Sequence, residues 1–182
     1  MQKPKAQKLE IQKVLMMGLD KSGKSSIALT LKNETNLMNY LSLKPTIGVE
    51  VSKIEHDKEL LLIWDLGGQK AYRDKYKENF DKYFTGAERI IYVIDVQDNE
   101  RYSLSLDYLR DVLSEIKEND SIKYLTIFFH KYDPNIKKTD PDIDQAIRED
   151  LLPKIKVIVP SWVDFKSFKT TIFTAFHRIF IQ

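Results

Sequence analysis

The segment Gly18–Ser25 has the residue types and spacing that suit the binding of phosphate groups. Its sequence, Gly-Leu-Asp-Lys-Ser-Gly-Lys-Ser, fits the pattern G-x-x-x-x-G-K-S. Gly23 lets the backbone approach oxygen atoms closely, and successive amide N–H groups then line an anion-sized concavity at a helix N-terminus. We expect Lys24 to supply a fixed charge for the β- and γ-phosphates and Ser25 to offer its hydroxyl to Mg²⁺. The predicted nucleotide-binding residues of this segment are Asp20, Lys21, Ser22, Gly23, Lys24, Ser25 and Ser26.

A second candidate segment, Asp65-Leu66-Gly67-Gly68-Gln69, follows the apolar run Leu60–Trp64. A carboxylate at the tip of a strand is where a phosphate-loop protein places its second Mg²⁺ contact, usually through water. We therefore predict Asp65 as a metal residue, and the Gly68 N–H as a donor to a γ-phosphate. Gln69 is predicted to be catalytic, together with Lys24, because its side chain could orient an attacking water molecule.

A third candidate is Thr46, in the stretch Pro45-Thr46-Ile47-Gly48. A threonine in this connecting segment can coordinate Mg²⁺ while a γ-phosphate holds the segment closed. The predicted metal residues are accordingly Ser25, Thr46 and Asp65.

The fourth candidate, His130-Lys131-Tyr132-Asp133, comes directly after the apolar run Tyr124–Phe129. The Asp133 carboxylate can accept from N1 and the exocyclic amine of guanine together, whereas adenine offers no such pair of donors. Lys131 can lay its aliphatic stem along the base. Thr171, in a loop that could reach the guanine carbonyl, and His130 complete the predicted base-binding residues.

The elements that must position these residues are strands and helices in alternation. Short apolar runs end at Gly18, Asp65, Asp95 and His130, which suits parallel strands covered on both faces. Helical patterns start at Lys24 and Ser103, and a last one spans 172–180. Val49–Ile54, followed by the turn 56–59, predicts an antiparallel hairpin with the Leu60 run. Together these patterns predict a three-layer α/β domain, with Asn135–Asp144 as a surface loop.

Composition limits the remaining possibilities. The chain has 182 residues, enough for one domain with its own core, and no cysteine, which excludes disulfides, thiolate zinc sites and a cysteine nucleophile. Its net charge of +2 gives no support to a nucleic-acid partner. We divide the chain into a flexible basic arm at 1–10 and one domain at 11–182; the arm is a solvated terminus or, alternatively, a membrane-touching segment.

The four motifs in this order resemble the Ras superfamily of small GTPases, and within it the Arf/Arl family. The resemblance rests on Gly18-Leu19-Asp20, on Pro45–Gly48 and on Trp64–Gln69. It implies the small G domain of a P-loop NTPase, with a mostly parallel six-stranded sheet and one antiparallel hairpin at its edge. It also implies that 39–48 is switch I, 49–64 the interswitch hairpin and 66–83 switch II.

The chain departs from the Arf/Arl pattern at three places. His130 stands where that family has asparagine; Rag GTPases carry His-Lys-x-Asp at this position, so the change is compatible with guanine binding. The chain has no N-terminal glycine for myristoylation and no amphipathic N-terminal helix, so we expect membrane contact to come through partners. Only a short segment follows Thr171.

The resemblance implies a molecular switch that binds GTP or GDP with Mg²⁺ and hydrolyses GTP slowly without an activating protein. It implies an exchange factor, a GTPase-activating protein and effectors as partners, and a cytoplasmic location. Arg73 is a candidate for an arginine that acts in cis, with a solvated or partner-facing arginine as the alternative. Two other functions stay open, a nucleotide-binding interaction module with little or no hydrolysis and an ATP-using enzyme, which Asp133 disfavours.

Overall fold

The computed structural model describes residues 10–32, 37–56, 59–118 and 120–173. Its six strands are β1 (Glu10–Met17), β2 (Val49–His56), β3 (Glu59–Leu66), β4 (Ala87–Asp95), β5 (Tyr124–His130) and β6 (Asp164–Lys169). They form a single sheet of order β2-β3-β1-β4-β5-β6. Only the β2–β3 pair is antiparallel. The predicted α/β fold, with one antiparallel hairpin at the edge of a mostly parallel sheet, is confirmed.

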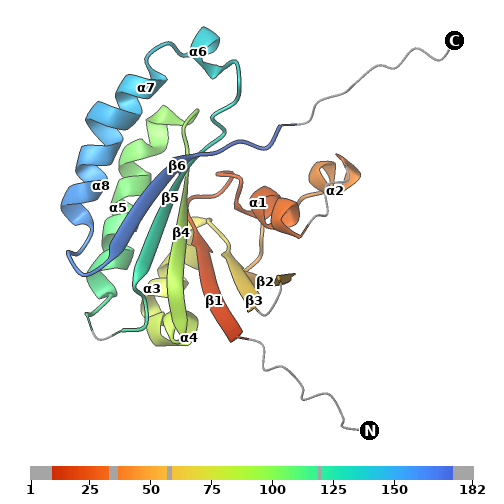
Figure 1. Cartoon of the computed structure of the whole chain (residues 1–182), viewed down its shortest axis with the longest axis vertical. Helices are drawn as coiled ribbons and strands as arrows, with labels where there is room; N and C mark the ends of the chain where they lie inside the picture. Colours follow the sequence, from red (N-terminus) through yellow and green to blue (C-terminus); the bar gives the residue numbers. More distant parts are fainter. Residues whose placement is uncertain (1–9, 33–36, 57–58, 119, 174–182) are drawn as a thin grey trace, which may run out of the picture.

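The helices lie on both sides of this sheet (Figure 1). The first half of the chain contributes α1 (Lys24–Leu31), α2 (Leu37–Leu41), α3 (Lys70–Glu78) and α4 (Phe80–Phe84). The second half contributes η1 (Asn99–Arg101), α5 (Tyr102–Glu115), α6 (Ile136–Thr139), α7 (Ile143–Gln145), η2 (Ala146–Leu151) and α8 (Leu152–Ile158). In Figure 1, α5 and α8 cover one face of the sheet and α1 lies on the other. No helix in this described part of the chain is both long and apolar enough to span a membrane.

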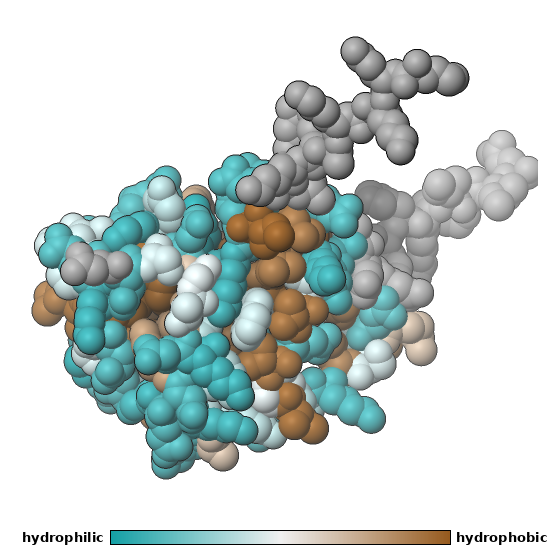
Figure 2. Space-filling model, turned by 90° about the horizontal axis from the view of Figure 1, so that it is seen from below, coloured by the Kyte–Doolittle hydropathy of each residue, from teal (hydrophilic) through white to brown (hydrophobic). Residues whose placement is uncertain are grey.

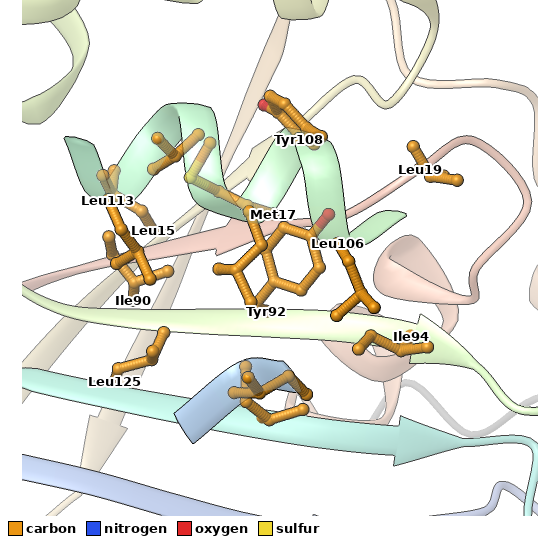
Figure 3. Close-up of a cluster of buried hydrophobic side chains, with 14 of the residues drawn as sticks. Leu15, Met17, Leu19, Ile90, Tyr92, Ile94, Leu106, Tyr108, Leu113 and Leu125 are labelled. Carbon is orange, nitrogen blue, oxygen red and sulfur yellow. The ribbon is translucent and has the colours of Figure 1, made fainter. Parts of the chain in front are cut away.

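The larger core lies between the sheet and α5. Alternate residues of a strand point to opposite faces, so Leu15 and Met17 of β1 face α5. Figure 3 shows these side chains directed toward Leu106 and Leu113 of α5. The Tyr92 hydroxyl lies within this core and donates to the Ser105 carbonyl at 2.7 Å. The core therefore holds β1 and β4 rigidly, and their carboxyl ends carry the candidate site.

The opposite face of the sheet has a smaller core. It contains Val14 and Met16 of β1 and Ile27 of α1, with Phe128 of β5 only partly buried against them. Apolar residues also reach the surface, and Figure 2 shows them gathered in a band between hydrophilic areas. Phe168 of β6 is 51% exposed and makes an edge contact with Phe128, with 6.4 Å between ring centroids.

Two features differ from the pattern-based expectations. β1 begins at Glu10, which we had assigned to the flexible arm; the remainder of the arm and most of the helix predicted at 172–180 lie outside the described residues. The surface loop predicted at Asn135–Asp144 is wrong in part, because α6 and the start of α7 lie there. Both helices are anchored by buried side chains, Ile136 and Ile143, which the charged residues around them concealed.

Candidate nucleotide-binding site

The phosphate loop runs from the end of β1 to the start of α1 and has an unusual backbone. Gly18 has a φ of +139° and packs so closely that an added Cβ would lie 2.3 Å from the Val93 carbonyl oxygen of β4. Lys21 and Gly23 also have positive φ angles, of 61° and 97°. Gly23 precedes the first residue of α1, so the free N–H groups of the helix terminus face the loop. This geometry suits an anion.

Lys24 is 5% exposed, and its ammonium group is directed back into the loop. Its Nζ atom donates to the carbonyl oxygens of Gly18 at 3.1 Å and Leu19 at 2.7 Å. Burial lowers the pKa of Lys24 to about 8, although the nearby carboxylates of Asp65 and Asp20 act in the opposite direction. A buried ammonium group whose hydrogen bonds go to two carbonyl oxygens, and to neither of these carboxylates, is well placed to bind a phosphate oxygen.

Three oxygen-bearing side chains from separate segments meet beside Lys24. Ser25 Oγ lies 2.5 Å from Asp65 Oδ2 and 2.9 Å from Thr46 Oγ1. Thr46 Oγ1 also donates to Asp65 Oδ2, at 3.1 Å. The structure thus brings together all three predicted metal residues.

The residues of this oxygen cluster, Ser25, Thr46 and Asp65, fit a Mg²⁺ ion. Asp65 is 2% exposed, and its second oxygen, Oδ1, is buried with no hydrogen-bond partner among the described residues. Burial raises the pKa of Asp65, which means that its charge is under-compensated in the protein alone. Hydroxyl and carboxylate oxygens are hard ligands, the kind that Mg²⁺ prefers.

The two predicted switch segments contact each other and the phosphate loop. The Gly67 N–H donates to the Gly48 carbonyl at 2.8 Å, and the Tyr76 hydroxyl donates to the same oxygen at 2.6 Å. A Cβ on Gly68 would lie 2.2 Å from the Asp20 nitrogen, so no larger residue fits against the loop there. Movement of one segment must therefore disturb the other.

Gln69 and Arg73, the two candidates for catalysis in the second switch, lie in different surroundings. Gln69 is the exposed residue that precedes α3 and lines the cavity described below. The Arg73 guanidinium lies 5.1 Å from the ring centroid of Tyr108 in α5. Arg73 is absent from the cavity wall, which gives no support to a role in cis, and its half-buried side chain, whose Nε atom is buried, packs against Tyr108 rather than being solvated.

His130, at the end of β5, is 3% exposed and lies beneath the phosphate loop. A Cβ on Gly23 would lie 2.5 Å from its ring, and its Nδ1 atom is 3.0 Å from Thr170 Oγ1. Burial lowers the pKa of His130, and the adjacent Lys131 lowers it further. The imidazole therefore supports the loop and connects it to the segment after β6.

The Asp133 carboxylate is held by donors from two other loops. Its Oδ1 atom accepts from the Thr171 hydroxyl at 2.6 Å, and its Oδ2 atom accepts from Gln97 Nε2 at 2.9 Å. Lys131 has a positive φ of 61°, and its ammonium group pairs with Asp95 Oδ2 at 2.6 Å. Contacts from Gln97, after β4, and from Thr171, after β6, therefore hold the motif that follows β5.

A cavity of about 390 Å³ joins most of these parts. Its lining residues are Asp20, Lys21, Gly23, Lys24, Ser25, Ser26, Leu43, Lys44, Pro45, Thr46, Gly68, Gln69 and Lys131. The other predicted residues do not line it: Ser22, Asp65 and His130 are buried behind it, and Asp133 and Thr171 contact each other beyond Lys131. A larger hollow, of about 700 Å³, lies between α4 and the loop before β5 and contains none of the predicted residues.

Pattern reasoning missed several residues that build the site. Asp95 is the last residue of β4 and Gln97 follows that strand, while Arg101, the last residue of η1, reaches Asp20. The apolar run that ends at Asp95 was a usable signal for that residue, because ligands bind outside the carboxyl ends of parallel strands. Arg101 lies in the segment Asp98–Arg101, which resembles the Arf family, but no role was predicted for it, and nothing in the sequence pattern pointed to Gln97.

Comparison with known proteins also indicates that the chain is a G protein. The family model described as the Gtr1/RagA G protein conserved region matches residues 13–180. ADP-ribosylation factor J of Dictyostelium discoideum is 33% identical over 125 residues, 68% of this chain; the match spans 60% of that protein's length.

Two solved structures show the same fold. The small GTPase Arl6 (BBS3) of Trypanosoma brucei, with the nucleotide analogue GppNp bound, aligns with a TM-score of 0.62 at 22% identity, over 88% of this chain and 87% of that chain. The mammalian SRP receptor aligns with a TM-score of 0.64 at 17% identity, over 88% and 91%.

Proposed function

Since the chain belongs to the Gtr1/RagA G-protein family, we propose that it is a guanine-nucleotide switch whose G domain spans 11–182. The resemblance to the Arf/Arl-like small GTPases of the Ras superfamily is confirmed by the family match, the Arf relative and the Arl6 fold. In this proposal the protein binds GTP with Mg²⁺, hydrolyses it slowly to GDP, and changes its switch segments to control effectors.

The observation that carries the proposal is the cluster of Ser25, Thr46 and Asp65. These residues come from the phosphate loop, switch I and the end of β3, and their oxygens lie 2.5–3.1 Å apart. An oxygen site beside a buried lysine is what a nucleotide with Mg²⁺ requires. Bound there, Mg²⁺ would neutralise charge on the phosphates. Thr46 is the residue that switch I contributes to this cluster. Its contact with the site would therefore form with GTP bound and be lost with GDP bound.

The chain's own residues supply the other parts of the reaction. Lys24 would bind β- and γ-phosphate oxygens, and the Gly68 N–H would donate to the γ-phosphate. Gln69 would hold the attacking water by accepting a hydrogen bond from it and donating one to a phosphoryl oxygen. None of the residues that line the cavity is an arginine, so the charge that speeds hydrolysis would come from an activating protein.

A second candidate, a nucleotide-binding module with little or no hydrolysis, is favoured by one observation. Gln69 is exposed, and its side chain makes no hydrogen bond with another described residue that would fix it toward the cavity, whereas the Lys24 side chain is held by two hydrogen bonds. Both candidates place the protein in the cytoplasm, with an exchange factor and effectors as partners and any membrane contact made through them.

The experiment is to identify the nucleotide that co-purifies with the protein, and then to measure single-turnover hydrolysis of GTP with and without Mg²⁺. We expect GDP or GTP in the purified protein, and slow hydrolysis that requires Mg²⁺. Binding without hydrolysis, even with candidate activating proteins, would favour the second candidate. Equal affinity for GDP and ADP would overturn both.

A further inference from the structure

The two oxygens of the Asp133 carboxylate are each held by one donor from outside its own loop. Thr171, after β6, donates to Oδ1, and Gln97, after β4, donates through Nε2 to Oδ2. A carboxylate has about four acceptor positions, so one donor on each oxygen leaves the remaining positions free for a ligand. The two donors also fix the plane of the carboxylate.

Gln97 makes a second contact that fixes the same motif. Its Nε2 group donates to the Lys131 carbonyl at 2.8 Å. Lys131 has a φ of +61°, a conformation that costs a residue with a side chain energy and persists only where its surroundings hold it. One side-chain amide thus holds both the strained turn and the carboxylate that follows it.

Gln97 is itself held in place by Asp95. The Gln97 backbone N–H donates to Asp95 Oδ1 at 3.0 Å, while Asp95 Oδ2 pairs with the Lys131 ammonium group. The contacts close a ring that runs from Asp95 through Gln97 to Lys131 and back. The exposed Gln97 side chain therefore has a defined direction, and removing it leaves the core intact.

We propose that Gln97 is a specificity-determining positioning residue, which orients the Asp133 carboxylate for the two N–H donors on the Watson–Crick edge of guanine. The inference rests on the proposed guanine-nucleotide function. A carboxylate that can rotate still accepts one hydrogen bond from a base but loses the paired arrangement. The loss should therefore affect guanine, which offers N1–H and an amine, more than hypoxanthine, which offers N1–H alone.

The experiment measures the dissociation constants of GDP, IDP and ADP for the full chain. The test variant is Gln97→Leu, which keeps the size of the side chain but removes the donor; Gln97→Glu adds repulsion toward Asp133. The matched control is Gln145→Leu, because Gln145 also donates to a carboxylate, Glu149, at 2.8 Å on the surface of α7. We expect the IDP/GDP ratio of dissociation constants to fall about five-fold in Gln97→Leu and further in Gln97→Glu. It should stay unchanged in the control.

Three results would overturn the role of Gln97 while leaving the proposed function intact. The first is an IDP/GDP ratio in Gln97→Leu that equals the wild-type ratio, and the second is a weakening of GDP, IDP and ADP binding by the same factor. The third is that Gln97→Leu changes the IDP/GDP ratio as much in an Asp133→Asn background as it does in the wild-type protein. The last follows because Gln97 is argued to act through that carboxylate, so in Asp133→Asn the ratio should shift less than about two-fold. A wild-type protein that binds ADP as well as GDP would instead overturn the function and, with it, this inference.

Discussion

The guanidinium group of Arg101, the last residue of η1, connects this short helix to the phosphate loop through Asp20. Its NH1 atom lies 3.1 Å from Asp20 Oδ1, and its NH2 atom donates to the Asp20 carbonyl at 3.2 Å. Its Nε atom donates to Asp98 Oδ2 at 2.5 Å, which aims the guanidinium at the loop. The curvature of the loop is thus stabilised from a part of the chain that carries none of the nucleotide motifs.

We predict that Arg101→Ala increases the GDP dissociation rate about three- to ten-fold, because the loop loses a half-buried charged contact at Asp20. Stopped-flow release of a fluorescent GDP measures this rate. The control is Arg110→Ala, since Arg110 pairs with Asp107 at 2.6 Å on the exposed surface of α5. Equal rates in the two variants would show that the contact between Arg101 and Asp20 does not hold the loop.

Lys24→Ala should lower the affinity for GDP and GTP by about 100-fold or more, because the phosphates lose a buried cation at the centre of the loop. Isothermal titration calorimetry measures the loss. Lys154→Ala is the control, because Lys154 is an exposed lysine of α8 that pairs with Asp150 and does not line the cavity. Nucleotide affinity close to normal in Lys24→Ala would rule out our assignment of the phosphate loop.

The sequence predicted the parts of the site in which one short segment carries the chemistry. The glycines and Lys24 of the phosphate loop are recognisable because their spacing follows from the backbone geometry around an anion. The strands that end at Asp65 and His130 were recognisable because both of their faces are covered and their sequences are apolar. β6 lacks such an apolar sequence and was not identified by its own residues. It is an edge strand and mostly exposed, and polar residues separate its two phenylalanines.

The contacts between segments could not be predicted. Gln97 and Asp133 are 36 residues apart, and Arg101 and Asp20 are 81 apart, so their meeting depends on the register of β4 beside β5 and on the position of α5. The helix over 146–158 was missed for a different reason. Its buried residues Ile147, Leu151 and Ile155 recur every four positions among charged residues, and this sparse pattern is easily overlooked.

Gln69→Leu should leave GTP affinity nearly unchanged and slow activated hydrolysis about 100-fold or more. The side chain is exposed at the mouth of the cavity, so its removal costs little ground-state binding. The Gln69 side chain would contribute only when water is positioned for attack. Its loss should therefore lower the rate of hydrolysis and leave the affinity for GTP constant. Single-turnover hydrolysis and GTP affinity are measured together, with Gln145→Leu as the control. A loss of affinity as large as the loss of rate would mean that Gln69 binds the nucleotide rather than the water.

His130 should make stability depend on pH in a specific direction. Burial, together with the positive charge of Lys131, lowers its pKa below the ordinary 6.5, while Asp95 and Asp133 act the other way. Between 6.5 and that lower folded-state pKa the unfolded chain binds more protons than the folded protein, so stability falls as the pH falls through this window.

We predict that the free energy of unfolding of the nucleotide-free protein decreases more between pH 7.5 and pH 5.5 than that of His130→Asn. Urea denaturation of both proteins at the two pH values measures the difference, and because every other titrating group is common to both, each protein controls for the other. At pH 7.5 the variant should be less stable, since asparagine leaves space beneath Gly23 where the ring packs. An equal decrease in the two proteins would show that the imidazole is free to take up a proton in the folded state, and that it does not support the phosphate loop as a buried neutral ring.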